Sequence, residues 1–356
     1  MEKQLMKGCE AIAEAAIRAG CRYFFGYPIT PQNDIPEYMA AKLPKVGGCF
    51  LQAESEIAAI NMVYGAAGAG ARVMTSSSSP GISLKMEGIS YCVGAELPCV
   101  VVNVVRGGPG LGSIQASQGD YFQATRGGGH GDYHVIAFAP ASVQETIDLM
   151  QDAFDLADQY RTPVMMIADG IIGQMMEPVQ FPETAKKREL PPKDWATTGW
   201  SPKSARPRAV VNSLYIEFEA LDELNQRLQS RYKAIRENEV RAEEYKLDGA
   251  EIIIVAYGTI ARICKSAIAL CEKKGVKVGL VRPITIWPFP EKAVLDAVLR
   301  PSVKAALAVE ISAGQMVEDV RLAVNGAKPV EFLGRPGSYV PTAEEICEKI
   351  MNMRRA

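Results

Sequence analysis

The sequence predicts an α/β protein with two doubly wound, mainly parallel domains joined by a linker with a long helix. Short, continuously apolar segments alternate with helical patterns up to about residue 180 and again from about residue 250. Such strands are typical of a parallel sheet that is covered on both faces. Between the two regions the composition shifts to Pro, Lys and Arg, which is typical of an extended linker.

Residues 1–183 are predicted to form the first domain. Amphipathic or Ala- and Gly-rich patterns predict helices over residues 5–19, 55–71, 81–95 and 142–159. Apolar, largely β-branched segments predict strands over residues 21–28, 71–77, 98–105 and 163–169. Because ligands bind at the carboxyl ends of strands in open α/β sheets, the residues that follow these strands are the first candidates for a site.

Residues 184–249 are predicted to be a linker with a long helix, and residues 250–356 a second domain. One charged helix is expected over residues 212–246, with an apolar face for a surface or an interface. Its apolar positions are Leu214, Ile216, Phe218, Leu221, Leu224 and Leu228. In the second domain, strands are expected at 251–258, 276–283 and 305–310, and helices at 260–274, 290–299 and 315–325, with Gly275 as a helix C-cap.

The composition argues against several functions. The 39 basic and 41 acidic side chains leave a formal net charge of −2, which attracts neither nucleic acid nor an acidic membrane surface. No segment approaches the ~18 apolar residues that span a bilayer, and the N-terminal segment lacks the apolar run of a signal peptide. We therefore expect a cytoplasmic protein that binds neither nucleic acid nor membrane.

The eight cysteines are widely spaced, and none form a CxxC pair. Iron–sulfur and zinc sites usually have closer cysteine spacing. We therefore expect buried, reduced thiols and no metal site on this chain.

The first candidate site follows the first predicted strand, where Tyr27, Pro28, Ile29, Thr30 and Pro31 are consecutive. The two prolines restrict the backbone, so Thr30 would present its hydroxyl from a rigid turn. Thr30 could equally cap a helix that has proline at its first position. The two roles are compatible.

Two further candidates are a pair of carboxylates and an arginine. Glu54 and Glu56 open the predicted helix 55–71, where the helix dipole favours negative charge in any case. A catalytic carboxylate would instead be buried and would face a ligand. Arg106 ends the strand at 98–105 and precedes a glycine-rich loop, so it could hold a carboxylate or phosphate, or lie on the surface.

Two loops remain ambiguous on local grounds. Residues 75–81, TSSSSPG, could bind an anion at a helix start or simply cap that helix. Residues 127–132, GGGHGD, match no nucleotide-binding fingerprint and could form a mobile loop or a structural turn. Neither His130 nor His134 lies in a triad or metal-binding pattern.

Taken in order, these segments resemble a known family. The order is YPITP, ESE followed by a glycine, a Ser/Thr-rich turn with PG, RGGPG, QGD and GGHG. This resembles the α-type subunit of 2-oxoacid:ferredoxin oxidoreductases, which implies a thiamine diphosphate-binding fold of the pyrimidine type. Residues 250–356, with RPITIWPFP, resemble the transketolase C-terminal-like domain that follows it. The branched-chain (2-oxoisovalerate) type is the most similar, and the 2-oxoglutarate type is next.

The resemblance implies roles for named residues. The family glutamate lies nine residues before a glycine, which matches Glu56 and Gly65 and excludes Glu54. A carboxyl group against N1′ of the pyrimidine helps the cofactor to lose the proton of its reactive carbon. Thr30 matches a threonine near the cofactor and the 2-oxo group, and Arg106 an arginine near the substrate carboxylate. The expected cofactor contacts are Tyr27, Pro28, Ile29, Thr30, Glu56 and Ser79.

The resemblance also implies an activity and partners. The activity is coenzyme A-dependent oxidative decarboxylation of a 2-oxo acid, with 3-methyl-2-oxobutanoate as the best candidate, and with reduction of ferredoxin. The family's diphosphate and Mg²⁺ motif is GDG followed by Asn, whereas here Ala168-Asp169-Gly170 has no Asn before Asn212. A β subunit is therefore expected to supply that half-site. [4Fe–4S] clusters are expected on partners, which include a γ subunit and a ferredoxin-like subunit.

Two departures and three alternatives stay open. The family often has glycine where Ser79 stands, and the loop Gly110-Leu111-Gly112-Ser113 differs as well, which puts the shape of the substrate pocket in doubt. The 2-oxoglutarate enzyme is the first alternative. The others are a non-catalytic scaffold subunit and a transketolase-like transferase that is split into two chains.

Overall fold

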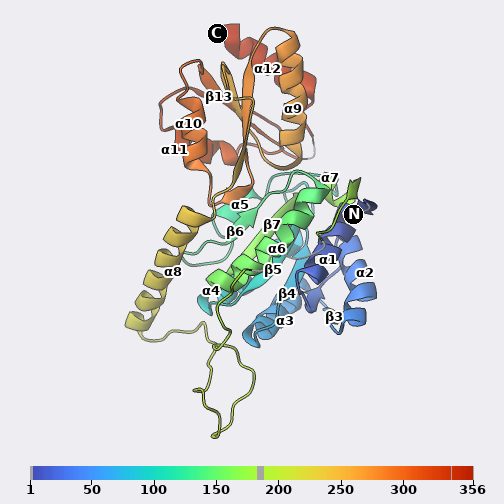
Figure 1. Ribbon diagram of the computed structural model, residues 1–356, viewed down its shortest axis with the longest axis vertical. Helices are drawn as coiled ribbons and strands as arrows, with labels where there is room; N and C mark the ends of the chain where they lie inside the picture. The colour runs from blue at the N-terminus through green and yellow to red at the C-terminus, as the bar shows by residue number, and fades with distance from the viewer. Residues whose placement is uncertain (1–2, 183–187, 338, 356) are drawn as a thin grey trace.

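The protein consists of two α/β units stacked along its longest axis, with the C-terminal unit at the top of Figure 1. The computed structural model describes residues 3–182, 188–337 and 339–355. The α/β class and the mainly parallel strands are as predicted. Within the described residues, no helix has the length and apolar character needed to cross a membrane.

The lower unit is built on a seven-stranded sheet with the order β12-β6-β7-β5-β4-β2-β3. All neighbours are parallel except β12 and β6. The strands are β2 (Tyr23–Gly26), β3 (Cys49–Gln52), β4 (Val73–Ser77), β5 (Cys99–Val105), β6 (Ile136–Phe138), β7 (Pro163–Asp169) and β12 (Thr285–Trp287). The central strands β4, β5 and β7 are buried along their whole length, which explains their continuously apolar or small residues.

Helices cover this sheet, and a separate two-stranded sheet packs against α1 and α6. The helices are α1 (Gly8–Arg18), α2 (Asp34–Lys42), the 3₁₀ helix η1 (Leu43–Val46), α3 (Glu56–Gly68), α4 (Pro80–Gly94), α5 (Tyr121–Thr125), α6 (Val143–Tyr160) and α7 (Gly170–Gln174). β1 (Gln4–Lys7) pairs with β8 (Met176–Val179) in antiparallel fashion. The helix predicted from residue 5 therefore begins only at Gly8, because the preceding backbone is used in this pairing.

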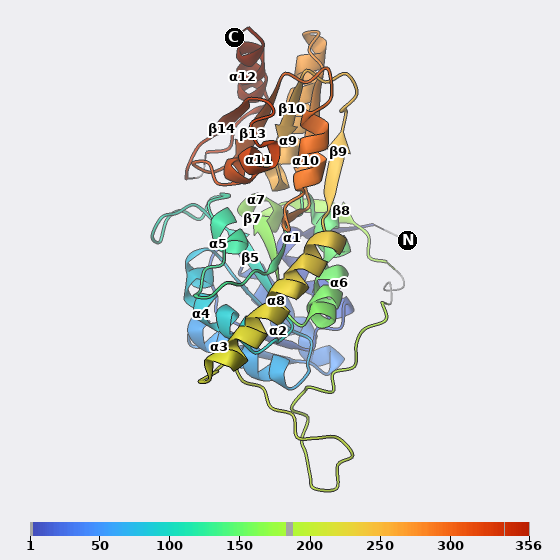
Figure 2. The ribbon, with the colours of Figure 1, turned by 90° about the vertical axis from the view of Figure 1, so that its left-hand side faces the viewer.

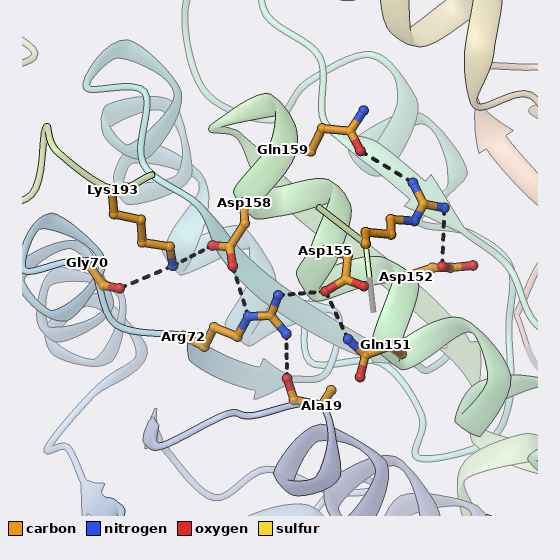
Figure 3. Close-up of polar contacts among 10 residues, drawn as sticks. Ala19, Gly70, Arg72, Gln151, Asp152, Asp155, Asp158, Gln159 and Lys193 are labelled. Carbon is orange, nitrogen blue, oxygen red and sulfur yellow. Dashed lines mark hydrogen bonds and ion pairs between the residues drawn. The ribbon is translucent and has the colours of Figure 1, made fainter. Parts of the chain in front are cut away.

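An ion-pair network joins the strand β4 region to α6 and to the linker (Figure 3). Arg72 donates to Asp155 at 2.6 Å and to Asp158 at 2.8 Å, and both carboxylates belong to α6. Lys193 of the linker reaches Asp158 at 2.6 Å and the Gly70 carbonyl at 3.1 Å. The linker is thus attached to the first unit at this point.

The upper unit contains a five-stranded sheet with the order β14-β13-β10-β11-β9, parallel except for β9. Its strands are β9 (Ala242–Tyr245), β10 (Ile252–Val255), β11 (Val278–Pro283), β13 (Ala305–Glu310) and β14 (Val330–Gly334). Its helices are α9 (Gly258–Lys273), α10 (Glu291–Val298), α11 (Met316–Val324) and α12 (Ala343–Arg355). Gly275 has a φ of 73°, which suits its predicted place at the end of α9.

The long helix is shorter than predicted. α8 spans Phe218–Asn238 and lies across the lower unit in Figure 2. Residues 242–245 form β9 instead, because they pair with β11. Of the predicted apolar face, Leu224 and Leu228 are buried, whereas the other four positions are exposed. The domain boundaries at 183/184 and 249/250 stay predictions.

The two units are joined by buried polar contacts. Gln118 donates its amide to the Tyr257 carbonyl at 2.9 Å and accepts from the Ile311 N–H at 3.0 Å. The Tyr121 hydroxyl donates to Asp319 at 2.5 Å. The loop that leads from β5 to α5 is therefore held against the upper unit.

Candidate functional site

The turn after β2 is held by the side chain of Arg106, which follows β5, and by that of Gln32 within the same loop. The Arg106 guanidinium donates to the Thr30 carbonyl at 2.8 Å, and the Gln32 amide donates to the Tyr27 carbonyl at 3.2 Å. Because α2 begins only at Asp34, Thr30 does not cap a helix, and that alternative is wrong. Thr30 is exposed, with its hydroxyl available at the carboxyl edge of the sheet.

The two glutamates at the start of α3 differ in burial. Glu56 is only 6% exposed, whereas Glu54 lies at the surface. Ser55 caps the helix by accepting from the Ala58 N–H at 3.2 Å. A Cβ built on Gly81 would lie 2.6 Å from Glu56 Oε1 and 2.0 Å from Ser77 Oγ, so the glycine leaves the space that the Glu56 side chain occupies.

Ser79 is the centre of a buried hydrogen-bond network at the carboxyl ends of β4 and β5. Its hydroxyl donates to Asp120 at 2.6 Å and accepts from the Arg106 N–H at 3.0 Å. Asn103 donates to the same Asp120 carboxylate at 2.8 Å and accepts from the Ser79 N–H at 3.1 Å. Burial raises the pKa of Asp120, and the hydrogen bonds from Ser79 and Asn103 oppose that effect. Ser79 therefore fixes the turn between β4 and α4.

Arg106 is buried and connects the candidate residues. Besides the Thr30 carbonyl, its guanidinium donates to the Leu111 carbonyl at 2.8 Å, which ties down the glycine-rich loop after β5. Its Nε has no hydrogen-bond partner among the described residues. Thr30, Arg106 and Ser79 thus form one connected group, and Ser77 and Gly81 lead from Ser79 to Glu56.

Several buried polar atoms in this region also have no partner within the part of the chain that the structure describes. They are Ser77 Oγ, Ser78 Oγ, Lys85 Nζ and Arg106 Nε. Buried polar groups are normally hydrogen-bonded, and unpaired ones need a specific explanation. Ser77 Oγ and the Glu56 carboxylate both lie beside Gly81, so these two polar groups share one buried region.

The Asp169 carboxylate accepts several hydrogen bonds from the backbone. Asp169 lies in the segment Ala168-Asp169-Gly170, which matches the diphosphate motif only in part. Its carboxylate caps α7 by accepting from the N–H groups of Ile171 at 3.0 Å and Ile172 at 3.2 Å, and it also accepts from the Thr259 N–H at 3.3 Å. Burial raises its pKa. Asp169 therefore joins the two units and is not free to bind a metal.

The glycine-rich loop at 127–132 packs as a structural turn. Gly127 and Gly131 have φ values of 73° and 101°, which favour glycine. Gly129 donates its N–H to the Tyr133 hydroxyl at 3.0 Å, and Ser90 of α4 donates to the His130 carbonyl at 2.8 Å. Within the described residues, no group of three or more His, Cys, Asp or Glu side chains is arranged to hold a metal ion.

A cavity of about 590 Å³ opens beside the turn after β2. Its lining includes Thr30, Lys7 and Asp34, but neither Glu56 nor Arg106. Lys7 Nζ lies 3.2 Å from Asp34 Oδ1, so the amine is paired with a carboxylate. This pairing with Asp34 raises the pKa of Lys7. The remaining lining is of mixed polarity, with Ile114, Ala116, Ile171 and Met175 among the apolar residues.

Four buried or half-buried polar residues of this region were not named as candidates: Gln32, Lys85, Asn103 and Asp120. A polar residue in the middle of the apolar strand at 98–105 and a lysine in a helix of small and apolar residues are unusual, and both signals were available in the sequence. The sequence could not show which residues they bond, because Asn103 and Ser79 both bond to Asp120, which lies elsewhere in the chain.

The fold and the connected residues at the carboxyl edge define a subunit of the 2-oxoacid:ferredoxin oxidoreductases. Residues 14–244 match the family model described as pyruvate flavodoxin/ferredoxin oxidoreductase, thiamine diphosphate-binding. Residues 250–346 match the core domain II of pyruvate:ferredoxin oxidoreductase. The chain therefore belongs to this family of oxidoreductases.

Among the relatives compared, this chain shares more sequence identity with a ketoisovalerate subunit than with a 2-oxoglutarate subunit. The chain is 49% identical to the ketoisovalerate oxidoreductase subunit VorB of Methanothermobacter marburgensis, over 98% of this chain and 97% of that protein. It is 37% identical to the 2-oxoglutarate synthase subunit KorA of Methanothermobacter thermautotrophicus, over 99% and 100%. The solved 2-oxoglutarate:ferredoxin oxidoreductase of Magnetococcus marinus superposes with a TM-score of 0.85 at 25% identity, covering 99% of this chain and 65% of that one.

Proposed function

We propose that this chain is the α-type subunit of an enzyme that oxidatively decarboxylates 3-methyl-2-oxobutanoate to the acyl-coenzyme A and carbon dioxide, with ferredoxin as electron acceptor. The observation that carries the proposal is the buried Glu56 against Gly81, at the same strand ends as Thr30 and Arg106, in a chain of this family. Thiamine diphosphate supplies the nucleophilic carbon and the electron sink of the reaction.

The residues around Glu56 suit the pyrimidine half of that cofactor. Gly81 leaves room for the carboxylate, and the unpaired Ser77 and Ser78 hydroxyls provide donors and acceptors in a buried setting. Glu56 would hold a proton at the pyrimidine ring, because a carboxylate that is shielded from water exchanges a proton with a bound partner efficiently. Thr30 would present its hydroxyl to the 2-oxo group, and Arg106 Nε is a free donor for the substrate carboxylate.

Partner subunits are proposed to complete the site. Asp169 is occupied as a helix cap, so the Mg²⁺-diphosphate half of the cofactor is assigned to a β subunit. Iron–sulfur clusters are assigned to other chains, namely the γ and ferredoxin-like subunits that the family resemblance implies, and coenzyme A is the acyl acceptor. The eight cysteines are free, and seven of them are buried. A cytoplasmic location stays a prediction, which cell fractionation would test.

The substrate assignment is supported by the identity to VorB and by the cavity beside Thr30. A 2-oxoglutarate enzyme needs an unpaired cation for the second carboxylate. Lys7, which lines the cavity, is neutralised by Asp34, which also accepts from Gln174 at 3.0 Å. A paired amine is a poor carboxylate receptor, so this feature favours a substrate with an uncharged side chain.

Viologen reduction tests the proposal directly. The chain is co-purified with its native partners and assayed with thiamine diphosphate and coenzyme A on 3-methyl-2-oxobutanoate, 2-oxoglutarate and pyruvate. We expect the highest kcat/KM with 3-methyl-2-oxobutanoate. Preference for 2-oxoglutarate would favour the 2-oxoglutarate enzyme. Activity without an electron acceptor would favour a transketolase-like transferase. No coenzyme A-dependent reduction by a cofactor-loaded complex would contradict the oxidoreductase assignment.

A further inference from the structure

Lys85 is a fully buried amine for which the fold alone gives no reason. It lies on α4, and its Nζ has no hydrogen-bond partner among the described residues. Removing an ammonium group from water without a partner is costly, and a buried lysine is therefore almost always paired or functional. A methionine would fill a similar volume without that cost.

The spacing along two helices places Lys85 next to Glu56. Residues 81, 85 and 88 lie on one face of α4, because they are four and three positions apart. A Cβ on Gly81 would lie 2.6 Å from Glu56 Oε1, and one on Gly88 would lie 2.5 Å from Ile60 Cγ2. Glu56 and Ile60 are themselves one turn apart on α3. Lys85 therefore lies in the α3–α4 interface, between the contacts to these two residues.

Glu56 is the charged group that acts on Lys85. Burial lowers the pKa of Lys85 to about 8, and the negative charge of Glu56 opposes that effect. Other ionisable groups lie on the segments that pack against α4. They are Tyr64, Asp120, His130, Tyr133 and Asp169, with Glu87, Tyr91 and Cys92 on α4 itself.

We propose that Lys85 is a positioning residue of the thiamine site: its buried ammonium group, one turn along α4 from the Gly81–Glu56 contact and without a hydrogen bond to Glu56, stabilises the Glu56 carboxylate through its charge. The inference rests on the proposed function, because Glu56 is the residue through which Lys85 acts. It explains why a lysine stands at a position where an apolar residue would stabilise the fold. Sites of function commonly keep such costly residues.

Cofactor affinity in a double-mutant cycle tests this inference. Thiamine diphosphate binding, with Mg²⁺, is measured by titration calorimetry on the partner-loaded complex for the wild type, Lys85→Met, Glu56→Gln and the double variant. We expect Lys85→Met to weaken binding at least about tenfold at pH 7, and to add less than about twofold in the Glu56→Gln background. Ile89→Met, a buried apolar change on the same helix, should bind like the wild type.

The pH dependence gives a second readout that a purely structural role would not change. Wild-type affinity should fall as the pH rises through about 8, where Lys85 loses its charge. That component should be missing in Lys85→Met, while contributions from the cofactor and the partner chain remain in both proteins.

Three results would overturn the inference. One is wild-type affinity in Lys85→Met, and another is an equal loss of affinity with and without Glu56. The third is a lowered melting temperature of the Lys85→Met chain, which would show that Lys85 supports the fold. A wild-type complex that binds the cofactor but oxidises no 2-oxo acid would contradict the proposed function instead, and the affinity cycle would still decide the role of Lys85.

Discussion

At the scale of single residues, neighbouring glutamates in this protein have different surroundings. Glu54 is exposed and contributes to the favourable charge at the start of α3, as any acidic residue there would. Glu56 points into the α3–α4 interface, where Gly81 provides the space and Lys85 a positive charge. Local sequence could not separate the two, because both lie near the same helix start. Only the family spacing to Gly65 selected Glu56.

Replacing Glu56 by Gln should abolish most of the activity. The amide keeps the volume but cannot exchange a proton, so viologen reduction should fall by about 10²–10⁴-fold. Glu54→Gln is the matched control and should retain activity. Unchanged turnover in Glu56→Gln would favour a scaffold subunit over a catalytic one.

The stability of the chain should depend on Lys85 in a defined pH range. Burial lowers its pKa in the folded state to about 8 from 10.5, so the unfolded chain binds more protons between these values. The free energy of unfolding therefore increases as the pH rises from about 8 to about 10.5. Below that range, the full free-energy cost of burying the charged amine is present. Lys85→Met should raise the free energy of unfolding of the isolated chain by about 1–3 kcal/mol at pH 7.

Chemical denaturation at pH 7 and pH 10.5 measures this effect. The gain in Lys85→Met should shrink at the higher pH, because the amine of the folded wild-type chain is then neutral. An equal gain at both pH values would mean that packing, and not charge, causes it.

Substrate preference should respond to Asp34. Asp34→Asn leaves the Lys7 amine without its carboxylate partner, which stood at 3.2 Å. The ratio of kcat/KM for 2-oxoglutarate over that for 3-methyl-2-oxobutanoate should rise, by about tenfold for one newly available cation. Asp296→Asn, in an exposed pair with Lys292, is the control. An unchanged ratio would mean that the cavity beside Thr30 does not receive the substrate side chain.

At the scale of elements, the sequence predicted the buried strands and the helices between them well. Strands such as β5 and β7 are apolar throughout, so their pattern does not depend on distant partners. The strands that were missed are β1, β3, β6, β8, β9, β12 and β14. β1 and β9, for example, exist only through pairing with a strand elsewhere in the chain. The long helix was predicted to extend too far for the same reason. Its charged helical pattern continues to residue 246, but residues 242–245 pair with β11 and form β9.

The candidate site was predictable only in part, for a related reason. Thr30, Ser79 and Arg106 each follow a predicted strand, whereas Glu56 follows β3, which was not predicted. The shared edge of the sheet brings these residues together. The hydrogen bonds that fix them come from loops and helix faces. Asp120 is the example: the sequence placed it in the QGD segment of the family resemblance but did not predict its bonds to Ser79 and Asn103.

The network around α6 should contribute measurably to stability. Asp158→Ala removes a carboxylate that is only 4% exposed, so Lys193 loses its only carboxylate partner among the described residues and Arg72 keeps only Asp155. We expect a loss of about 3 kcal/mol in the free energy of unfolding, as for one partner of a buried pair. Lys292→Ala breaks an exposed pair and should cost less than about 0.5 kcal/mol. Similar values for both would show that solvent screens the Arg72 network.

At the scale of the whole molecule, the two units share buried contacts and a continuous apolar core. Gln118 exchanges hydrogen bonds with Ile311 in both directions and also donates to the Tyr257 carbonyl. Asp169 adds a contact from the end of β7 to the start of α9. These contacts lie at the carboxyl edge of the first sheet. A conformational change in the upper unit can therefore shift the site residues at that edge.

Gln118→Ala should uncouple the two units. Its side chain is 2% exposed, so the change leaves the Tyr257 carbonyl and the Ile311 N–H buried without partners. We expect a loss of about 2–4 kcal/mol and a calorimetric transition that broadens or splits in two. Gln229→Ala, which removes an exposed bond to the Asp132 carbonyl, should leave a single transition. A single, unshifted transition in Gln118→Ala would mean that the apolar contacts alone couple the units.

Strand β12 has a consequence for how the protein is made. Residues 285–287 lie beside β6 at the edge of the first sheet, next to residues 137–138, although the rest of that sheet ends at residue 169. On the ribosome, the edge of β6 therefore stays open while more than a hundred further residues are synthesised. An open strand edge can pair with the wrong chain. Nascent chains that stall before residue 287 should therefore depend strongly on chaperones, whereas chains released after it can close the sheet themselves.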